Sequence, residues 1–321
     1  MVCGDLTNNG GFSAGAGSTV LVQDTCLLCP GGIVHGQTLA GNMTGTARFW
    51  HLTITKPLTT QVNAAANIDI AGNFTTSNAT SDFNSNGKYI RLGGNFNNAN
   101  GAVTYMGSAP GGTLEFNGTA AQTFSAGGAL DLNNVRINNT GGGVTLAGNN
   151  MRIGAAGTFD LVQGLVITNA LEVYVMNNAP NALTGGSATS HVQGNLRRNL
   201  NGLPGSFDFP VGHAVKGYQK ANITFTTNTT IPDLVANFLD IELPEKQALR
   251  NCGWGYVETS QLKDYPEDAL RDQVEHGTNV FVSSYAPKAT FDVDGNLTGA
   301  LDFAEHDAYI KRYAAHGLIL F

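Results

Sequence analysis

The chain has 321 residues, of which 41 are glycine and only 13% are charged. This is about twice the usual glycine share and about half the usual charged share. The formal net charge is −7, and Lys and Arg form no cluster, which excludes a nucleic-acid partner because phosphate binding needs grouped cations. No run of about 18 apolar residues is present, so no membrane span is expected.

The distribution of charge divides the chain near residue 231. Residues 1–230 hold 10 basic and 9 acidic side chains, whereas residues 231–321 hold 7 basic and 15 acidic ones. A neutral body rich in Asn, Gly and Thr is therefore followed by an acidic tail. We expect three parts, namely β-solenoid repeats over 1–180, a β-rich junction over 181–245 and an α/β segment over 246–321.

Short phrases in the first part of the chain recur about 83–90 residues later. Residues 4–10 return as 94–101, residues 37–39 as 122–124, and residues 50–54 as 133–137. Copies of one supersecondary unit usually stack, because a single unit cannot bury its own apolar face. The repetition favours a scaffold or a binding surface over a compact catalytic pocket.

The body is predicted to consist of short β-strands. Apolar and polar residues alternate in short runs, each bounded by Gly or Asn, which accept the positive φ of tight turns. This pattern indicates a parallel β-helix whose Asn side chains link one coil to the next; a propeller or a sandwich is the alternative, with longer strands and more regular hairpins. The expected core residues are Ile68, Ile70, Ile90, Leu92, Leu114, Phe116, Val135, Ile137, Val144, Leu146, Ile153, Leu165 and Ile167.

Several blocks of the body resemble the repeats of very large secreted surface proteins of the Bacteroidota. The blocks are residues 94–103, 114–124 and 132–139. A further block, residues 192–198 with 209–212 and Tyr218, resembles the junction that closes such arrays before a β-sandwich segment. Proteins of this family leave the cell by type IX secretion and serve as adhesins or carriers. The resemblance covers residues 4–230 and implies a secreted or cell-surface location, with a polysaccharide or cell-surface glycan as partner.

The tail alternates strands with helices, which is typical of a parallel sheet covered by helices. Strands are expected at residues 254–257, 279–282 and 318–321. Pro266 and Gly277 bound one expected helix, and Asp302 with Glu305 forms a capping box at the start of another that ends at Gly317. The predicted fold class is mostly β, a parallel β-helix or solenoid with a β-sandwich-like junction and a short, truncated α/β segment at the C-terminus.

Two helix ends in the tail, residues 276–277 and 316–317, are His-Gly pairs that lead into apolar strands. They resemble the opening of glycosidase-type (β/α)₈ barrels. A complete barrel takes about 250 residues, so we expect only its beginning here. Glycoside hydrolysis normally uses two carboxylates, which these barrels carry on later strands. We therefore expect no hydrolysis by these residues alone and assign no catalytic residue. The alternative function is an accessory domain joined to the N-terminal fragment of a glycoside hydrolase.

Three aromatic residues of the tail are candidates for carbohydrate binding, namely Trp254, Tyr256 and Tyr285. Trp254 and Tyr256 lie near the carboxyl end of the first expected barrel strand, the edge at which such barrels place their sites. Aromatic rings there can stack on sugar rings, and packing in the core is the alternative.

The cysteines do not predict a cofactor. Cys26 and Cys29 have the spacing of half a zinc site or of a redox pair, but Cys3 and Cys252 are remote from them. A local disulfide or a free pair is therefore favoured over a metal site or redox catalysis, and no cofactor is expected.

A weak calcium-loop pattern begins at Asp82. Asp82, Asn84 and Asn86 match the first half of such a loop, but Gly93 occupies the position that needs a bidentate Glu. An ordinary Asn/Gly turn is the favoured interpretation. The sequence thus predicts a secreted or cell-surface solenoid scaffold or adhesin segment, whose flat faces present Asn, Thr and Ser to a polysaccharide or a surface.

Limited proteolysis tests the division of the chain. A solenoid can fold on its own repeats, because each repeat is stabilised by its neighbours, whereas a short parallel sheet leaves edge strands without partners. We expect a protease to cut first after residues 243–246 and to leave a resistant β-rich fragment, identified by mass spectrometry. A resistant fragment of residues 250–321 with digested repeats would contradict the boundary.

Overall fold

In the computed structural model the chain forms two compact units, Met1–Asp240 and Ile241–Phe321. The structure describes residues 4–23, 36–55, 61–77, 81–99, 111–202, 204–227, 232–238, 254–257, 280–283, 304–315 and 319–320, together with Val2, Asp292 and Thr298.

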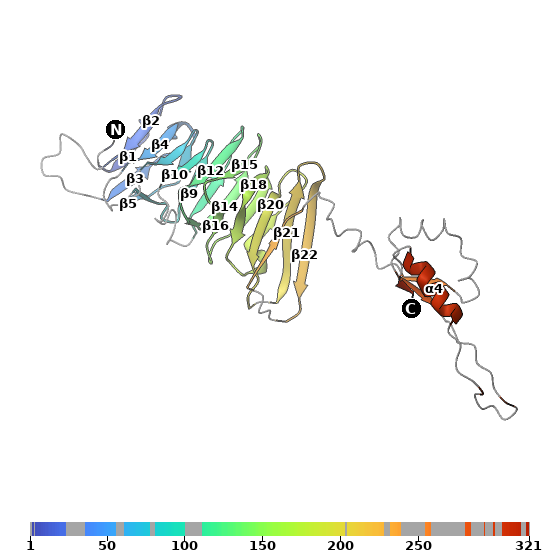
Figure 1. Ribbon diagram of the computed structural model, residues 1–321. Coiled ribbons are helices and arrows are strands. Elements are labelled where there is room, and N and C mark those ends of the chain that lie inside the picture. Colours follow the sequence, from blue (N-terminus) through green and yellow to red (C-terminus); the bar gives the residue numbers. More distant parts are fainter. Residues whose placement is uncertain are drawn as a thin grey trace. The chain divides into compact units, whose positions relative to one another are not determined.

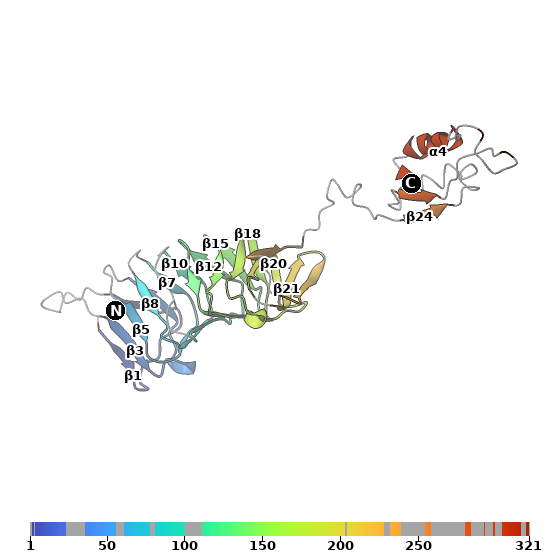
Figure 2. The same cartoon turned by 90° about the horizontal axis from the view of Figure 1, so that it is seen from below.

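The first unit is a parallel β-solenoid of about seven turns, as predicted (Figure 1). The strands of successive turns pair in parallel along three sides, and Figure 2 shows the strands of one side, β1, β3, β5 and β8, following one another. This four-stranded sheet contains β1 (Leu6–Asn8), β3 (Gln37–Gly41), β5 (Gln61–Ala64) and β8 (Asp82–Asn84). A six-stranded sheet contains β6 (Ile68–Ile70), β9 (Tyr89–Leu92), β11 (Thr113–Phe116), β14 (Asn134–Asn138), β17 (Phe159–Gln163) and β19 (Leu183–Gly185).

The third side is the longest and forms a 13-stranded sheet. Its solenoid strands are β2 (Thr19–Val22), β4 (His51–Ile54), β7 (Phe74–Thr76), β10 (Phe96–Asn98), β12 (Gln122–Ala126), β15 (Val144–Ala147), β18 (Val166–Val175) and β20 (Val192–Asn199). The long strand β18 also pairs with β16 (Met151–Ile153), and β16 pairs with β13 (Asp131–Leu132). These two strands form a short branch of the sheet beside its main row. Two 3₁₀ turns, η1 (Gly45–Ala47) and η2 (Pro180–Ala182), lie between strands.

Antiparallel strands form the predicted β-rich junction. β21 (Gly205–His213) pairs with β22 (Gly217–Phe225), and β23 (Asp233–Ala236) pairs with β20, so the junction extends the solenoid's own sheet. Arg198 lies fully buried there, where its guanidinium donates hydrogen bonds to the carbonyl oxygens of Asp208, Ala179 and Pro180. Burial lowers the pKa of Arg198 to about 10, which still leaves it charged at neutral pH.

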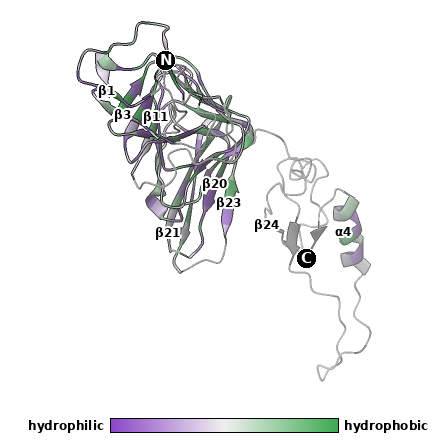
Figure 3. Cartoon of the chain, turned by 90° about the vertical axis from the view of Figure 1, so that its left-hand side faces the viewer, coloured by the Kyte–Doolittle hydropathy of each residue, from purple (hydrophilic) through white to green (hydrophobic). Residues whose placement is uncertain are grey.

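Buried and less buried residues alternate along most strands of the solenoid, and the buried side chains form the core. Figure 3 shows the hydrophobic and hydrophilic residues of these strands by colour. The inward side chains of successive turns stack on one another. The ring centroids of Phe74 and Phe96 lie 5.6 Å apart, and those of Phe96 and Phe124 lie 5.1 Å apart. Such stacks combine apolar burial with aromatic contact, so each turn is held mainly by the turns before and after it.

The predicted core is confirmed except for Leu165 and Ile167, which are half-buried. The buried residue between them is Val166, which pairs with Val144 on one side and with Val192 on the other. Leu165, Val166 and Ile167 are all apolar, so alternation within this run does not decide which residue points inward. The register with the neighbouring turns decides it, because a shift of one residue reverses both faces of a strand.

The repeat is confirmed, but its structural period differs from the predicted one. Residues stacked at one position of the six-stranded sheet are 21 to 24 residues apart, as in Ile68, Ile90, Leu114, Val135, Phe159 and Leu183. Phrases expected to be copies lie on different sheets, since Leu39 is in β3 and its expected counterpart Phe124 is in β12. Many of the described turns use similar Asn/Gly corners and short alternating strands, so similar phrases occur at non-equivalent positions.

The second unit contains the three predicted strands in one parallel sheet. Its strands are β24 (Trp254–Val257), β25 (Val280–Ser283) and β26 (Ile319–Leu320), in that order. The predicted helix before β26 is α4 (Ala304–Ala315), and the helix expected between residues 266 and 276 lies outside the described residues. None of the helices in the described part of the chain is long and apolar enough to cross a membrane.

Replacing Ile137 by Asp tests the stacked core. Ile137 is fully buried between Phe116 and Leu161 of the adjacent turns, so the substitution places an unpaired carboxylate inside the solenoid. We expect a loss of more than about 3 kcal/mol of unfolding free energy, measured by urea denaturation. Val162→Asp is the matched control, because Val162 is 41% exposed. Equal stability of the two variants would contradict the core assignment.

Candidate functional site

The outward side chains of the six-stranded sheet form a ladder of alternating charge. Asp69, Arg91, Glu115, Arg136 and Asp160 occupy the same position in five successive strands. Arg91 Nη1 lies 3.0 Å from Asp69 Oδ1, Arg136 Nη1 lies 2.9 Å from Asp160 Oδ2, and Glu115 lies 3.6 Å from the Nε of each arginine. The hydrogen bond that Arg91 donates to Asp69 raises the pKa of Arg91. These five charges therefore largely compensate one another.

The outward positions of the 13-stranded sheet have a different chemistry. From β4 to β12 one row contains Thr53, Thr75, Asn97 and Ser125, and none of these side chains is charged. This row agrees with the prediction that a flat face presents Thr, Asn and Ser. The two sheets thus meet at a corner with a charged face on one side and a neutral polar face on the other.

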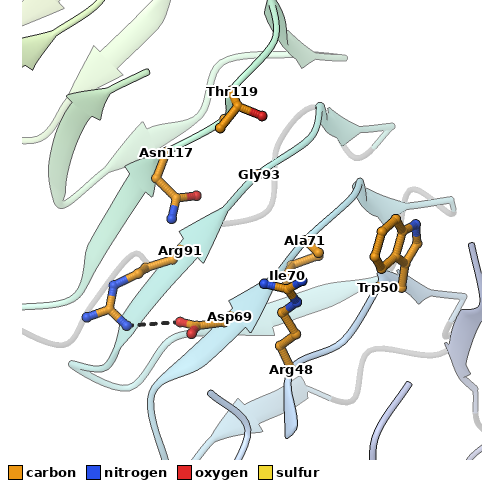
Figure 4. Close-up of a pocket in the computed structure, with 10 residues that line it drawn as sticks. Arg48, Trp50, Asp69, Ile70, Ala71, Arg91, Gly93, Asn117 and Thr119 are labelled. Carbon is orange, nitrogen blue, oxygen red and sulfur yellow. Dashed lines mark hydrogen bonds and ion pairs between the residues drawn. The ribbon is translucent and has the colours of Figure 1, made fainter. Parts of the chain in front are cut away.

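A shallow pocket of about 280 Å³ lies at this corner, where β6, β9 and β11 end (Figure 4). Its lining consists of Arg48, Trp50, Asp69, Ile70, Ala71, Arg91, Gly93, Asn117, Gly118 and Thr119. These residues come from four successive turns. Since neighbouring strands lie about 4.8 Å apart, the pocket extends for roughly 14 Å along the stack, which is longer than a single sugar ring.

Two glycines allow the turns to approach closely in the floor of the pocket. A Cβ atom on Gly93 would lie 2.5 Å from the carbonyl oxygen of Ala71, and one on Gly118 would lie 2.7 Å from the carbonyl oxygen of Gly93. Neither position therefore accepts a side chain without movement of the backbone. The floor consists of tightly stacked backbone, and the side chains around it define the opening.

A buried amide fixes the corner that carries Asn117 and Thr119. Gln122, only 2% exposed, accepts a hydrogen bond from the backbone N–H of Gly118 at 2.9 Å. Its Nε2 donates to the carbonyl oxygens of Leu92, at 2.8 Å, and Gly94. Gln122 thus joins the turn at Gly118 to the preceding turn and holds the pocket wall in place.

Further side chains link the corners of successive turns, as predicted for the Asn residues. His51 Nδ1 accepts a hydrogen bond from the N–H of Asn73 at 2.8 Å, Asn73 Oδ1 accepts one from the N–H of Asn95 at 2.9 Å, and Asn95 Oδ1 accepts one from the N–H of Thr123 at 2.9 Å. Each link runs from a side chain to a backbone amide of the next turn. The corners are therefore rigid, and the pocket is preorganised.

The groups around the pocket suit the binding of a polar ligand with an apolar face. Trp50 is half-buried and presents an aromatic ring, Asn117 is half-buried, and Thr119 and Arg48 are exposed. Within the described residues, the side chains of Asn117 and Thr119 have no hydrogen-bond partner and are available to a ligand. An amide and a hydroxyl each both donate and accept hydrogen bonds, which matches the hydroxyl groups of a sugar.

The carboxylate in the pocket lining is already engaged. Asp69 Oδ1 is paired with Arg91, and Asp69 Oδ2 accepts a hydrogen bond from the N–H of Gly45 at 2.9 Å. In Figure 4 the Asp69 carboxylate faces Arg91. The lining therefore provides groups for binding rather than the pair of free carboxylates that glycoside hydrolysis normally uses.

The aromatic residues proposed from the sequence are not in this pocket. Trp254 and Tyr256 belong to β24 of the second unit, and their side chains lie outside what the structure describes. Tyr285 lies outside the described residues altogether. Their assignment to carbohydrate binding stays a prediction.

The proposed metal ligands fall into two groups. Cys26 and Cys29 lie outside the described residues. Asp82 and Asn84 point to the same side of β8, where Gln61 donates to Asp82 Oδ2 at 2.8 Å and accepts from Asn84 Nδ2 at 3.2 Å. Asn86 has a φ of 49°, and its N–H donates to Asn84 Oδ1. In the part of the chain that the structure describes, no three His, Cys, Asp or Glu residues group as metal ligands.

Sequence analysis missed Trp50, Arg48, Asn117 and Thr119 as site residues. In the sequence Trp50 is part of one of the repeated phrases. Its size is a usable signal, because the next three turns hold the smaller residues Ala71, Gly93 and Asn117 at the same position. Comparison of the chain with protein-family models, curated proteins and solved structures found no match.

Removal of the Gln122 side chain tests the support of the pocket. Gln122→Ala removes the acceptor of the Gly118 N–H and the side-chain donor to the carbonyl oxygens of Leu92 and Gly94. We expect a loss of about 2–4 kcal/mol in unfolding free energy and faster hydrogen exchange at Gly118. Gln163→Ala is the control because Gln163 is exposed. Unchanged exchange at Gly118 in the Gln122 variant would show that the amide does not hold this turn.

Proposed function

We propose that this chain is a secreted or cell-surface β-solenoid scaffold that contacts polysaccharide through the corner pocket. The observation that carries the proposal is that Trp50, Arg48, Asn117 and Thr119 line one pocket built on stacked turns. The face of an aromatic ring packs against the apolar face of a sugar, while amide, hydroxyl and guanidinium groups bind its hydroxyls.

The architecture supports a scaffold role. A solenoid builds an extended surface from many turns, and its repeated corners place equivalent positions at regular intervals. Because the corner is fixed by Gln122 and by the links through Asn73 and Asn95, little ordering is needed when a ligand binds. The neutral row of Thr53, Thr75, Asn97 and Ser125 offers a second polar surface beside the pocket.

Secretion and an adhesin role rest on the resemblance of the repeats to the surface proteins of the Bacteroidota. The low charge and the short polar corners of the solenoid are compatible with that role. Protease treatment of intact source cells tests surface display, because a displayed solenoid loses its epitopes to the protease while cytoplasmic markers persist.

The alternative function, an accessory domain attached to a glycoside hydrolase, is supported by the second unit. Its strands β24, β25 and β26 are parallel and neighbour one another in chain order, as in the opening of a (β/α) barrel. In both proposals the solenoid contacts glycan, and the difference lies in what the second unit contributes.

Binding to a panel of immobilised polysaccharides tests the pocket. Trp50→Leu keeps an apolar side chain but removes the ring face, and we expect affinity to fall by about tenfold, or ~1.4 kcal/mol. Trp50→Phe keeps a ring and should retain most of the affinity. Affinity electrophoresis or calorimetry provides the measurement, and thermal melting confirms that the variants are folded.

Trp254→Leu is the control, because Trp254 is the other tryptophan of the chain and lies in the second unit. Loss of binding in this variant, with full binding by Trp50→Leu, would place the glycan site outside the solenoid. Absence of binding to every polysaccharide would contradict the proposed function itself.

A further inference from the structure

A second shallow pocket adjoins the first and shares two of its residues. It has a volume of about 400 Å³ and is lined by Ser13, Ala14, Ala16, Gly45 and Thr46, together with Arg48 and Trp50. Trp50 and Arg48 therefore belong to the walls of both pockets. The two pockets form one groove, defined here as the two linings together, which passes Trp50 and crosses the stacked turns from residues 13–16 to residues 117–119.

The groove contains an exposed guanidinium at Arg48. Among the described residues, Arg48 is exposed and has no ion-pair partner, whereas Arg91 is held by Asp69 at 3.0 Å and by Glu115 at 3.6 Å. Asp69 accepts hydrogen bonds from Arg91 and from the N–H of Gly45 and forms no ion pair with Arg48. Figure 4 shows Arg48 extending toward the centre of the pocket beside Trp50, while Asp69 faces Arg91.

This local charge does not follow from the chain as a whole, whose net charge is −7. Arg48 is in register with Asp69 at the end of the charge ladder, since Phe49 pairs with Ile70, but it forms no ion pair with Asp69 or with any other described residue. A guanidinium presents a planar fork of N–H donors that matches a carboxylate or a sulfate, and an exposed guanidinium without a partner is the group best suited to an anionic ligand.

We propose that the groove binds an acidic polysaccharide, with a carboxylate or sulfate group of the polymer at Arg48 and a neighbouring sugar ring against Trp50. This inference rests on the proposed function and specifies the ligand class. An extended polymer is favoured over a single sugar, because the groove continues on both sides of Trp50. The polymer lies along the stacking direction of the turns.

A matched pair of polymers separates charge from shape. The intact protein is titrated with a polyuronate, with the same polymer after full methyl esterification, and with a sulfated polysaccharide. We expect the polyuronate or the sulfated polymer to bind at least tenfold more tightly than the esterified one, with the difference reduced in 0.5 M salt by screening. The acidic polymer that binds with the higher affinity shows whether the groove recognises carboxylate or sulfate.

Substitution of Arg48 assigns the effect to this side chain. Arg48→Gln should weaken binding of the acidic polymer by about tenfold and leave the esterified polymer within twofold. Arg152→Gln is the control, because Arg152 lies on β16 and is paired with Asp131 at 2.7 Å.

The variant Ala16→Trp tests the extension of the groove, because it fills the second pocket from an exposed position. We expect it to weaken binding of the long polymer more than binding of a disaccharide.

The outcomes distinguish this inference from the proposed function. The preference for an acidic ligand would be overturned if the acidic and the esterified polymer bind with equal affinity, or if Arg48→Gln lowers the affinity for both equally. Either result would leave the proposal of polysaccharide binding intact. An Ala16→Trp variant that binds the long polymer normally would overturn the extension of the groove. The proposed function itself would be contradicted if none of the three polymers binds and Trp50→Leu does not change binding to any polysaccharide of the wider panel.

Discussion

The parallel register between successive turns is the constraint on which the rest of this structure depends. It places Phe74, Phe96 and Phe124 in one stack inside the solenoid and places like positions above one another on every face. A helical bundle buries a stripe of each helix, but here each short strand buries only a few side chains. Stability must therefore come from repetition, because a single turn has too little apolar surface to fold alone.

The same register governs the corners, where the chain changes direction and backbone groups lose their strand partners. Buried N–H and C=O groups without partners are costly, and this chain satisfies many of them with amide side chains from a neighbouring turn. Gln122 and Asn139 do this deep inside one corner, and Asn73 and Asn95 do it nearer the surface. The richness in Asn and Gly is thus a structural requirement of tight stacked turns.

Register also makes the outside of the molecule periodic. One face has the alternating charges of Asp69, Arg91, Glu115, Arg136 and Asp160, and the adjoining face has uncharged Thr, Asn and Ser. A regular pattern of this kind leaves few positions that stand out. Trp50 does stand out, because the next three turns hold the smaller residues Ala71, Gly93 and Asn117 at its position, and Arg48 beside it has no ion-pair partner among the described residues. The groove is therefore best understood as a local departure from the repeat, and such departures are where a scaffold acquires a binding function.

The sequence by itself determined the fold class and most of the core, because short alternating runs bounded by Asn and Gly leave few architectures that bury Ile90, Leu114 and Ile137 together. It also determined the order of strands and the last helix in the second unit. Only the tertiary structure decided that stacked residues of the six-stranded sheet are 21 to 24 residues apart and that Val166 points inward, because both depend on which turns pair. The pocket depends on the same pairing. Its residues come from four turns that are separated in sequence, and no local spacing indicates that Trp50 and Asn117 line one site.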